Sequence, residues 1–366
     1  MTRVLLAGGG TAGHVNPLLA VAHELIRHEV ATPAEILVVG TKEGLETRLV
    51  PEAGYALVTI GRLPLPRRLS LRALMFVPRF IAAVVASFRI IRSHRAKIVA
   101  GFGGYVSAPV YVAAWLARVP LVIHEANAVA GFANRWGARL TRHVVTTFSV
   151  TNLPGAKLLG MPMARAITHP TTRTSVSDAR KHFGLSARKK TLVVTGGSQG
   201  SVTINSTIEA VAADLLAAGW QILHIVGNRN PLPASVGPGY VALRYCDRMD
   251  LAFAAATAVI SRAGAATVSE IQLLGLPAVF VPYPVGNGEQ EKNAGNSLQA
   301  GAAVLVGDSD FTPAAVRTTV LPLLNDDVAL ESMRARAKGL GRADAAEAFV
   351  QVMAGALGDP KKGERS

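Results

Sequence analysis

The chain has 366 residues, of which 50% are hydrophobic and 17% are charged, a composition that excludes an intrinsically disordered protein. Because one hydrophobic core stops growing at roughly 250–300 residues, two domains are expected. The single cysteine, Cys246, excludes an internal disulfide and suits a reducing cytoplasm, and the net charge of +14 favours an anionic partner. A general bias toward arginine is the alternative explanation of that charge.

The first half of the chain alternates apolar runs of strand length with helical patterns. Short β-branched runs occupy residues 3–8, 35–40, 97–102, 120–125 and 143–148, and helical patterns lie between them at Pro17–His28 and Ala108–Arg118. Continuous apolar runs separated by helices are typical of buried parallel strands in βαβ units. The sequence therefore predicts a doubly wound α/β domain.

The loop "GGGTAGHVNP" follows the first predicted strand and matches G-x-G-x-x-G. A dinucleotide site would also need an acid at the end of the second strand, but that strand ends at Lys42 and Glu43 follows only after the turn. Without that acid, the loop predicts only a helix N-terminus whose N–H groups can hold an anion. The helix dipole there should lower the pKa of His14 and keep it neutral, as a general base requires. A capping or packing role is the alternative for this histidine.

The stretch Leu71–Lys97 is apolar but contains several arginines. Its longest uncharged run, Phe80–Phe88, is far shorter than the ~20 residues that span a bilayer. Arg72 and Arg79 share one helix face, which favours an in-plane contact with an anionic membrane. Three aromatic residues exceed the needs of a core and support this interpretation: Phe76, Phe80 and Phe88. A core helix with solvated arginines is the alternative.

The alternation of strands and helices restarts at Arg188–Asn205, after a Pro- and Gly-containing joint at Leu153–Pro170. Further strands are predicted at residues 220–227, 240–245, 257–264 and 277–283, and a last helix at Asp344–Leu357. The predicted fold class is α/β, with two Rossmann-like doubly wound domains facing a cleft. A ligand would bind between them, at the carboxyl ends of both sheets.

Two loops in the second half combine a strand end with a helix start. "TGGSQGS" (Thr195–Ser201) and "SRAGAATVSE" (Ser261–Glu270) both offer backbone N–H groups to a diphosphate. Glu270 could accept hydrogen bonds from a sugar diol, or it could be an acid that the helix dipole stabilises.

Polar residues also follow other predicted strands. Glu289, Gln290 and Asn293 lie in a loop after one strand and could bind sugar hydroxyls. "IHEANAVAGFANR" should place three more polar residues at the same cleft: His124, Glu125 and Asn127.

Other chemistries find little support. Asp308–Asp310 resembles a metal–diphosphate motif, but Thr312 and Pro313 favour an N-cap and the first turn of a helix. The sequence contains no zinc-ligand spacing, no G-x-S-x-G and no nucleic-acid-binding motif, so neither a metal site nor nucleic-acid binding is expected.

Taken together, six motifs resemble the MurG family, the bacterial peptidoglycan N-acetylglucosaminyltransferases. They are "GGTAGHVNP", "GFGGYVSAP", "HEAN", "GGSQG", "AGAATVSE" and "GEQEKNA". The resemblance implies a GT-B fold without a cofactor. It implies an acceptor-binding, membrane-associated domain at residues 1–163, to which a helix at 341–357 returns, and a domain at 164–340 that binds UDP-N-acetylglucosamine.

The resemblance also implies roles for individual residues. Contacts to the donor would come from Thr11, Ala12, Gly13, Asn127, Arg165, Ser198, Cys246, Ala265, Ala266, Thr267, Val268, Ser269, Glu270, Glu289 and Gln290. Contacts to the acceptor would come from His14, Gly103, Gly104 and Tyr105, with His14 as the candidate general base. The chain departs from the family pattern in Ala12, in "HEAN", in Glu289 and in Arg165. Arg165 lies one residue later in the chain than the arginine of the family pattern.

The reaction implied is an inverting transfer of N-acetylglucosamine to the 4-hydroxyl of undecaprenyl-pyrophosphoryl-N-acetylmuramoyl-pentapeptide. The enzyme would act peripherally at the cytoplasmic face of the cell membrane. Alternatives are a diacylglycerol glycosyltransferase or UDP-N-acetylglucosamine 2-epimerase on the same fold, an NAD-dependent oxidoreductase, and a non-catalytic membrane-binding module.

Overall fold

The structure is a computed structural model that describes residues 1–61, 63, 75–169, 175–233, 237–285 and 287–358. The chain forms two compact units, which are described separately. Unit 1 comprises Met1–Ala164 and Ala343–Ser366, and unit 2 comprises Arg165–Arg342.

Unit 1 is built on a parallel sheet, which in the described residues has the strand order β3-β2-β1-β4-β5-β6-β7. The strands are β1 (Val4–Ala7), β2 (Ile36–Thr41), β3 (Ala56–Ile60), β4 (Ile98–Gly101), β5 (Leu121–Glu125), β6 (His143–Thr146) and β7 (Lys157–Leu158). A short 3-10 turn, Pro33–Glu35, precedes β2.

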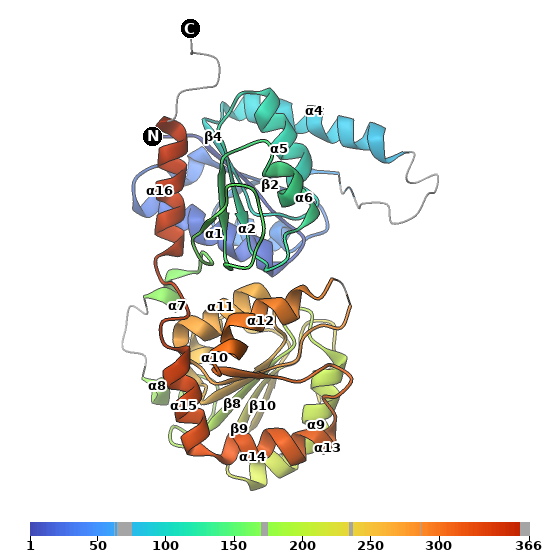
Figure 1. Ribbon diagram of the computed structural model, residues 1–366, viewed down its shortest axis with the longest axis vertical. Helices are drawn as coiled ribbons and strands as arrows, with labels where there is room; N and C mark the ends of the chain where they lie inside the picture. The colour runs from blue at the N-terminus through green and yellow to red at the C-terminus, as the bar shows by residue number, and fades with distance from the viewer. Residues whose placement is uncertain (62, 64–74, 170–174, 234–236, 286, 359–366) are drawn as a thin grey trace. The chain divides into compact units, whose positions relative to one another are not determined.

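Helices cover both faces of this sheet (Figure 1). Val4 and Leu6 of β1 pack into one core cluster, whereas Leu5 and Ala7 pack into the other, as the alternation of side chains along a strand requires. The first cluster includes α1 (Ala12–Arg27), α2 (Glu46–Glu52) and α16 (Ala345–Gly358), and the second includes α4 (Phe76–His94), α5 (Ser107–Leu116) and α6 (Phe132–Gly137).

Unit 2 repeats this architecture, with the strand order β10-β9-β8-β11-β12-β13 in its described part. The strands are β8 (Thr191–Thr195), β9 (Gln221–Ile225), β10 (Tyr240–Leu243), β11 (Ala258–Ser261), β12 (Ala278–Phe280) and β13 (Ala303–Leu305).

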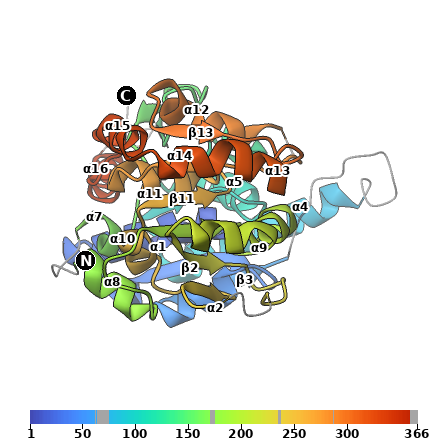
Figure 2. The same cartoon turned by 90° about the horizontal axis from the view of Figure 1, so that it is seen from below.

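The helices of unit 2 follow its strands in the βαβ pattern. They are α7 (Arg165–Thr168), α8 (Val176–His182), α9 (Val202–Ala217), α10 (Met249–Ala255), α11 (Ala265–Leu274), α12 (Glu289–Gln299), α13 (Pro313–Ala315), α14 (Leu321–Asn325) and α15 (Asp327–Ala337). One π-helical turn, Val316–Val320, joins α13 to α14. The helices α9 and α14 pack on one face of the sheet (Figure 2).

Two doubly wound α/β units confirm the predicted fold class. Three strands were not predicted: β3, an edge strand with alternating burial; β7, a strand of two residues; and β13, a short edge strand. The predicted start of α1 at Pro17 is wrong, because the helix begins at Ala12 within the glycine loop. The predicted cap is confirmed, because the Thr312 hydroxyl accepts a hydrogen bond from the Ala315 N–H at 3.2 Å.

The aromatic residues of α4 do not behave as predicted. Phe76, Phe80 and Phe88 are half-buried against the core of unit 1, so their number reflects packing. Arg72 lies outside the described residues. Within the part of the chain that the structure describes, no helix is both long enough and apolar enough to cross a membrane.

Candidate active site

His14 lies in the first turn of α1, where the glycine loop meets the helix. Its Nδ1 is 3.1 Å from the Gly9 carbonyl oxygen and 3.3 Å from the Thr11 hydroxyl. A carbonyl oxygen can only accept, so Nδ1 carries the proton of the neutral ring and donates it to Gly9. Nε2 then keeps its lone pair, which is the form that a general base requires.

Two glycines after β4 make room beside this ring. Gly103 and Gly104 have positive φ values of +89° and +85°, which favour glycine. A Cβ at Gly103 would lie 3.2 Å from Nε2 of His14, and one at Gly104 would lie 2.6 Å from the Gly9 carbonyl oxygen. Any side chain here would therefore crowd the imidazole or the loop that holds it. Tyr105 is next in the chain and has an exposed ring.

Burial lowers the pKa of His14, while Glu125, the Gly9 carbonyl and Glu46 each oppose that shift. The predicted direction agrees with this result. The predicted cause was the helix dipole, whereas the loss of hydration on burial makes the largest contribution to the lowered pKa.

Glu125, at the end of β5, organises the loop that follows it. Its carboxylate accepts hydrogen bonds from the Asn127 N–H, the Gly131 N–H and the Asn134 side-chain amide, each at 2.9 Å. Asn127, a predicted donor-binding residue, is thereby held directly after the strand and is half-buried.

The expectation that His124 faces a ligand is wrong. The ring is fully buried between Phe102 and Phe349, and Nε2 lies 3.1 Å from the Gly160 carbonyl oxygen. Burial lowers the pKa of His124 to about 4, so the ring stays neutral near pH 7. Neighbouring residues of a strand point to opposite faces, and of the pair His124 and Glu125 the histidine joins the core.

Glu46, in the first turn of α2, is a site residue that the sequence analysis missed. Its buried carboxylate accepts a hydrogen bond from the Gly10 N–H at 2.8 Å and another from the Thr41 N–H at 2.8 Å. The Gly10 N–H therefore binds a carboxylate of the protein itself, and the prediction that this loop cradles an external anion is not supported. The one signal in the sequence is an acid surrounded by glycines, in "GTKEGLE".

In unit 2, the start of α11 offers the clearest backbone donors. Gly264 is an extended N-cap, and Ala265, Ala266 and Thr267 form the first turn. The Val268 N–H donates to the Gly264 carbonyl at 2.9 Å, and the side chains of Val268 and Ser269 are buried beneath this turn. The N–H groups at the beginning of the helix are the ones that geometry directs outward.

Glu270 follows on the same helix and is half-buried. Burial raises the pKa of this carboxyl to about 7. A carboxyl with that pKa can exchange its proton close to neutral pH.

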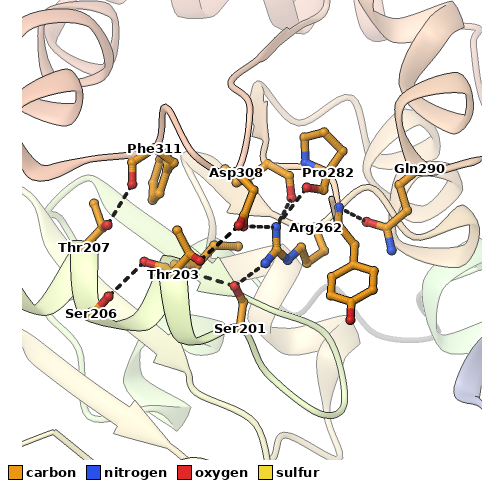
Figure 3. Close-up of polar contacts among 12 residues, drawn as sticks. Ser201, Thr203, Ser206, Thr207, Arg262, Pro282, Gln290, Asp308 and Phe311 are labelled. Carbon is orange, nitrogen blue, oxygen red and sulfur yellow. Dashed lines mark hydrogen bonds and ion pairs between the residues drawn. The ribbon is translucent and has the colours of Figure 1, made fainter. Parts of the chain in front are cut away.

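Arg262 is a second residue that the sequence analysis missed (Figure 3). It follows β11, is 9% exposed, and its guanidinium donates to the carbonyls of Val281 and Pro282 at 3.0 and 2.9 Å. It also donates to the Ser201 hydroxyl at 2.6 Å and pairs with Asp308 at 2.6 Å. One guanidinium thus links the start of α9, the loop after β12 and the loop after β13, and Asp308 serves this link.

Gln290 lies in the first turn of α12. Its Oε1 accepts a hydrogen bond from the Tyr283 N–H at 2.9 Å (Figure 3), which directs the amide NH₂ group, a donor, away from that loop. Glu289 precedes it and is half-buried. The expectation that Asn293 binds sugar hydroxyls is wrong, because Asn293 is fully buried and donates to the Ala263 carbonyl at 3.1 Å.

The remaining predicted residues of unit 2 lie in loops and at a helix start. Ser198 is half-buried in the loop before α9, and Arg165 is exposed in α7. Cys246 is buried after β10, and burial raises the pKa of its thiol. Unit 1 brings Thr11, His14 and Gly103 together, with Ala12 and Gly13 in the same helical turn.

Two family models match this chain: the glycosyltransferase family 28 N-terminal domain at residues 4–146, and the glycosyltransferase family 28 C-terminal domain at residues 191–349. The UDP-N-acetylglucosamine–N-acetylmuramyl-(pentapeptide) pyrophosphoryl-undecaprenol N-acetylglucosamine transferase of Leifsonia xyli is 50% identical over 353 residues, which cover 96% of this chain and 98% of that one.

The protein of the same name from Clavibacter michiganensis is 50% identical over 359 residues, covering 98% and 97% of the two chains. Among solved structures, MurG of Acinetobacter baumannii is similar, with a TM-score of 0.76, 27% identity, and coverage of 97% of this chain and 100% of that one.

Proposed function

Because the chain belongs to glycosyltransferase family 28, we propose that it transfers N-acetylglucosamine from UDP-N-acetylglucosamine to undecaprenyl-pyrophosphoryl N-acetylmuramyl-pentapeptide. The observation that carries this proposal is the 50% identity, over nearly the whole of both chains, to an enzyme named for this reaction. Unit 1 would bind the lipid-linked acceptor, and unit 2 would bind the nucleotide sugar.

The donor would bind through its diphosphate at the start of α11. The N–H groups of Ala265, Ala266 and Thr267 lie at a helix N-terminus, where backbone dipoles favour negative charge. The diphosphate gains charge as the sugar leaves, so donors that are already oriented stabilise the transition state more than the ground state. Glu270 would accept from the ribose hydroxyls, and the Gln290 amide would donate to a hydroxyl of N-acetylglucosamine.

The acceptor hydroxyl must lose a proton as it attacks the anomeric carbon. Nε2 of His14 would take this proton, because the hydrogen bond to Gly9 holds the proton of the neutral ring on Nδ1. A general base of this kind contributes ~10²–10⁴-fold to the rate. A single displacement from the face opposite to UDP inverts the configuration at the anomeric carbon.

A lipid-linked acceptor requires the enzyme to reach a membrane, and α4 has a surface suited to this. Val77, Ile81 and Val85 recur every four residues along one face of α4, and they are 60%, 57% and 42% exposed. Arg79 and Arg89 are exposed on the same helix. An apolar row with nearby arginines favours in-plane contact with the anionic cytoplasmic face of the membrane.

Vesicle binding tests this surface. Ile81→Glu should lower co-sedimentation with phosphatidylglycerol vesicles and leave binding of UDP unchanged, whereas Val328→Glu, on the exposed start of α15, should change neither. Equal binding of the vesicles by the wild type and both variants would place the membrane contact elsewhere.

A transfer assay tests the activity itself. Labelled UDP-N-acetylglucosamine and a short-chain lipid acceptor should give labelled disaccharide lipid with a β linkage, together with UDP. Conversion of the nucleotide sugar without an acceptor would favour an epimerase. Stabilisation of the protein by NAD but not by UDP would favour an oxidoreductase.

A further inference from the structure

We infer that Glu46 is a positioning residue for the general base: its carboxylate fixes the glycine loop whose Gly9 carbonyl orients His14. This inference rests on the proposed function, in which His14 accepts the proton of the acceptor hydroxyl. Glu46 belongs to no motif that carries the family resemblance, and its described hydrogen bonds come from Gly10 and Thr41.

The carboxylate of Glu46 joins two segments that are far apart in the sequence. Oε1 accepts from the N–H and the hydroxyl of Thr41, both at 2.8 Å, and Oε2 accepts from the Gly10 N–H at 2.8 Å. Glu46 is fully buried, so water does not compete for these hydrogen bonds. The three donors require acceptors only, which suits an ionised carboxylate.

Three glycines leave the space that this carboxylate fills. A Cβ at Gly9 or at Gly44 would collide with the carboxylate of Glu46, and one at Gly40 would collide with its Cγ. These glycines come from the loop after β1, the turn before α2 and the strand β2. The buried carboxylate of Glu46, rather than the close approach of a phosphate, explains why these three positions are glycines.

The contacts lead from Glu46 to the imidazole in two steps. Glu46 holds the Gly10 N–H, and the peptide that contains this N–H also contains the Gly9 carbonyl oxygen. That oxygen accepts the hydrogen bond from Nδ1 of His14 at 3.1 Å. Orienting this peptide therefore fixes both the tautomer and the direction of the ring.

Charge provides a second connection between the two residues. Among the described residues, the titratable groups that interact electrostatically with His14 are Glu46 from α2, and Glu125 and His124 from β5. Both carboxylates raise the pKa of His14 against the effect of burial. His124 is neutral near pH 7, since burial lowers its pKa to about 4. Removing the charge of Glu46 should therefore lower the pKa of His14 further.

The decisive variant is Glu46→Gln in the full chain, with Glu52→Gln as its matched control. Glu52 lies at the exposed end of the same helix and pairs with Arg48. A glutamine at position 46 cannot accept from both Thr41 and Gly10, because one of its two terminal atoms is a donor. The loop then shifts, and a displacement of about 1 Å at the base costs about 100-fold in kcat.

Two readouts separate positioning from stability. NMR titration of the His14 ring, assigned with His14→Gln, should give a lower pKa in Glu46→Gln than in the wild type. The kcat should fall about 100-fold, while KM for UDP-N-acetylglucosamine stays within about twofold. Glu52→Gln should match the wild type in all three quantities. An unchanged His14 titration, together with activity that only follows the folded fraction, would overturn the inference.

A milder variant covers the case in which Glu46→Gln does not fold. Thr41→Val removes one donor to Glu46 but keeps its charge and the backbone N–H. Thr41→Val should lower kcat by a smaller factor than Glu46→Gln does. An unchanged kcat in a folded protein would contradict the inference. Because the NMR titration needs no turnover, failure of the transfer assay with the wild type would overturn the proposed function alone.

Discussion

The two glycine loops of this chain look alike in sequence, but a buried carboxylate holds the first, whereas an arginine paired with an aspartate lies at the end of the second. Gly8–Gly13 of unit 1 is hydrogen-bonded to the buried carboxylate of Glu46. In unit 2, the helix that follows Gly196–Gly200 is capped by Ser201, whose hydroxyl accepts a hydrogen bond from the guanidinium of Arg262. A negative charge beneath a loop disfavours a bound diphosphate, whereas the charge of Asp308 near the loop of unit 2 is offset by Arg262 at 2.6 Å.

This difference shows why a G-x-G-x-x-G pattern does not by itself identify a nucleotide site. The pattern encodes a tight turn whose glycines have no side chains. The space that this leaves can be filled by a phosphate or by a carboxylate of the protein itself. We propose that the loop of unit 1 uses this space to orient a general base, and that unit 2 uses its loops to hold the nucleotide.

The largest effect is expected from removing His14, the proposed base in unit 1. His14→Ala should lower kcat by ~10²–10⁴-fold and leave the dissociation constant of UDP nearly unchanged. Asn16→Ala, an exposed position on the same helix, should behave as the wild type. If His14→Ala kept half of the turnover, the base would have to be another residue.

The next effect concerns the ion pair between Arg262 and Asp308 in unit 2. Asp308→Asn should weaken the pairing that orients Arg262 and raise the dissociation constant of UDP about tenfold, a loss of about 1.4 kcal/mol. Calorimetric titration measures this, with the neighbouring exposed Asp310→Asn as the control. Tighter binding by Asp308→Asn would refute a positioning role for the pair.

A moderate effect is expected from crowding the base without changing its chemistry. Gly103→Ala forces an alanine into a backbone of φ +89°, with its Cβ 3.2 Å from Nε2 of His14. We expect kcat to fall about tenfold while UDP binding is kept, in contrast to the Asp308 variant. Gly54→Ala, which has a similar φ of +83° and open space around it, controls for backbone strain.

The smallest effect depends on pH. Glu270 has a pKa of about 7 in the folded chain against 4.5 ordinarily, so the folded state binds the extra proton between these values. The contribution of protonated Glu270 to folding stability is therefore fully present below pH 4.5 and is lost as the pH rises through 7. Glu270→Gln should therefore raise the melting temperature by a few degrees at pH 8 but not at pH 4.5.

UDP should raise the melting temperature of Glu270→Gln less than that of the wild type, since an amide replaces the carboxylate proposed to accept from the ribose hydroxyls. An equal gain in melting temperature at both pH values would contradict the raised pKa.

The sequence predicted what local patterns encode. The buried strand β1, the glycine loop and the Thr312 cap all depend on neighbouring residues, and periodicity and cap chemistry are sufficient to find them. The edge strands β3 and β13 were missed because short, half-exposed strands lack a continuous apolar run.

Sequence reasoning failed where burial of a charge depends on distant partners. Arg262 and Ser201 are 61 positions apart, and Glu46 and Gly10 are 36 apart, so no local pattern identifies either pair. The pair His124 and Glu125 illustrates a second difficulty, because either of two neighbouring polar residues can face the core. Only the tertiary contacts with Phe102 and Phe349 decide that it is the histidine.

Hydrogen–deuterium exchange of the full chain with and without UDP tests the division between the two loops most directly. We predict slower exchange at residues 196–201 and 262–270 when UDP is bound, with no change at residues 8–14. Protection of residues 8–14 in the absence of any change in unit 2 would contradict it.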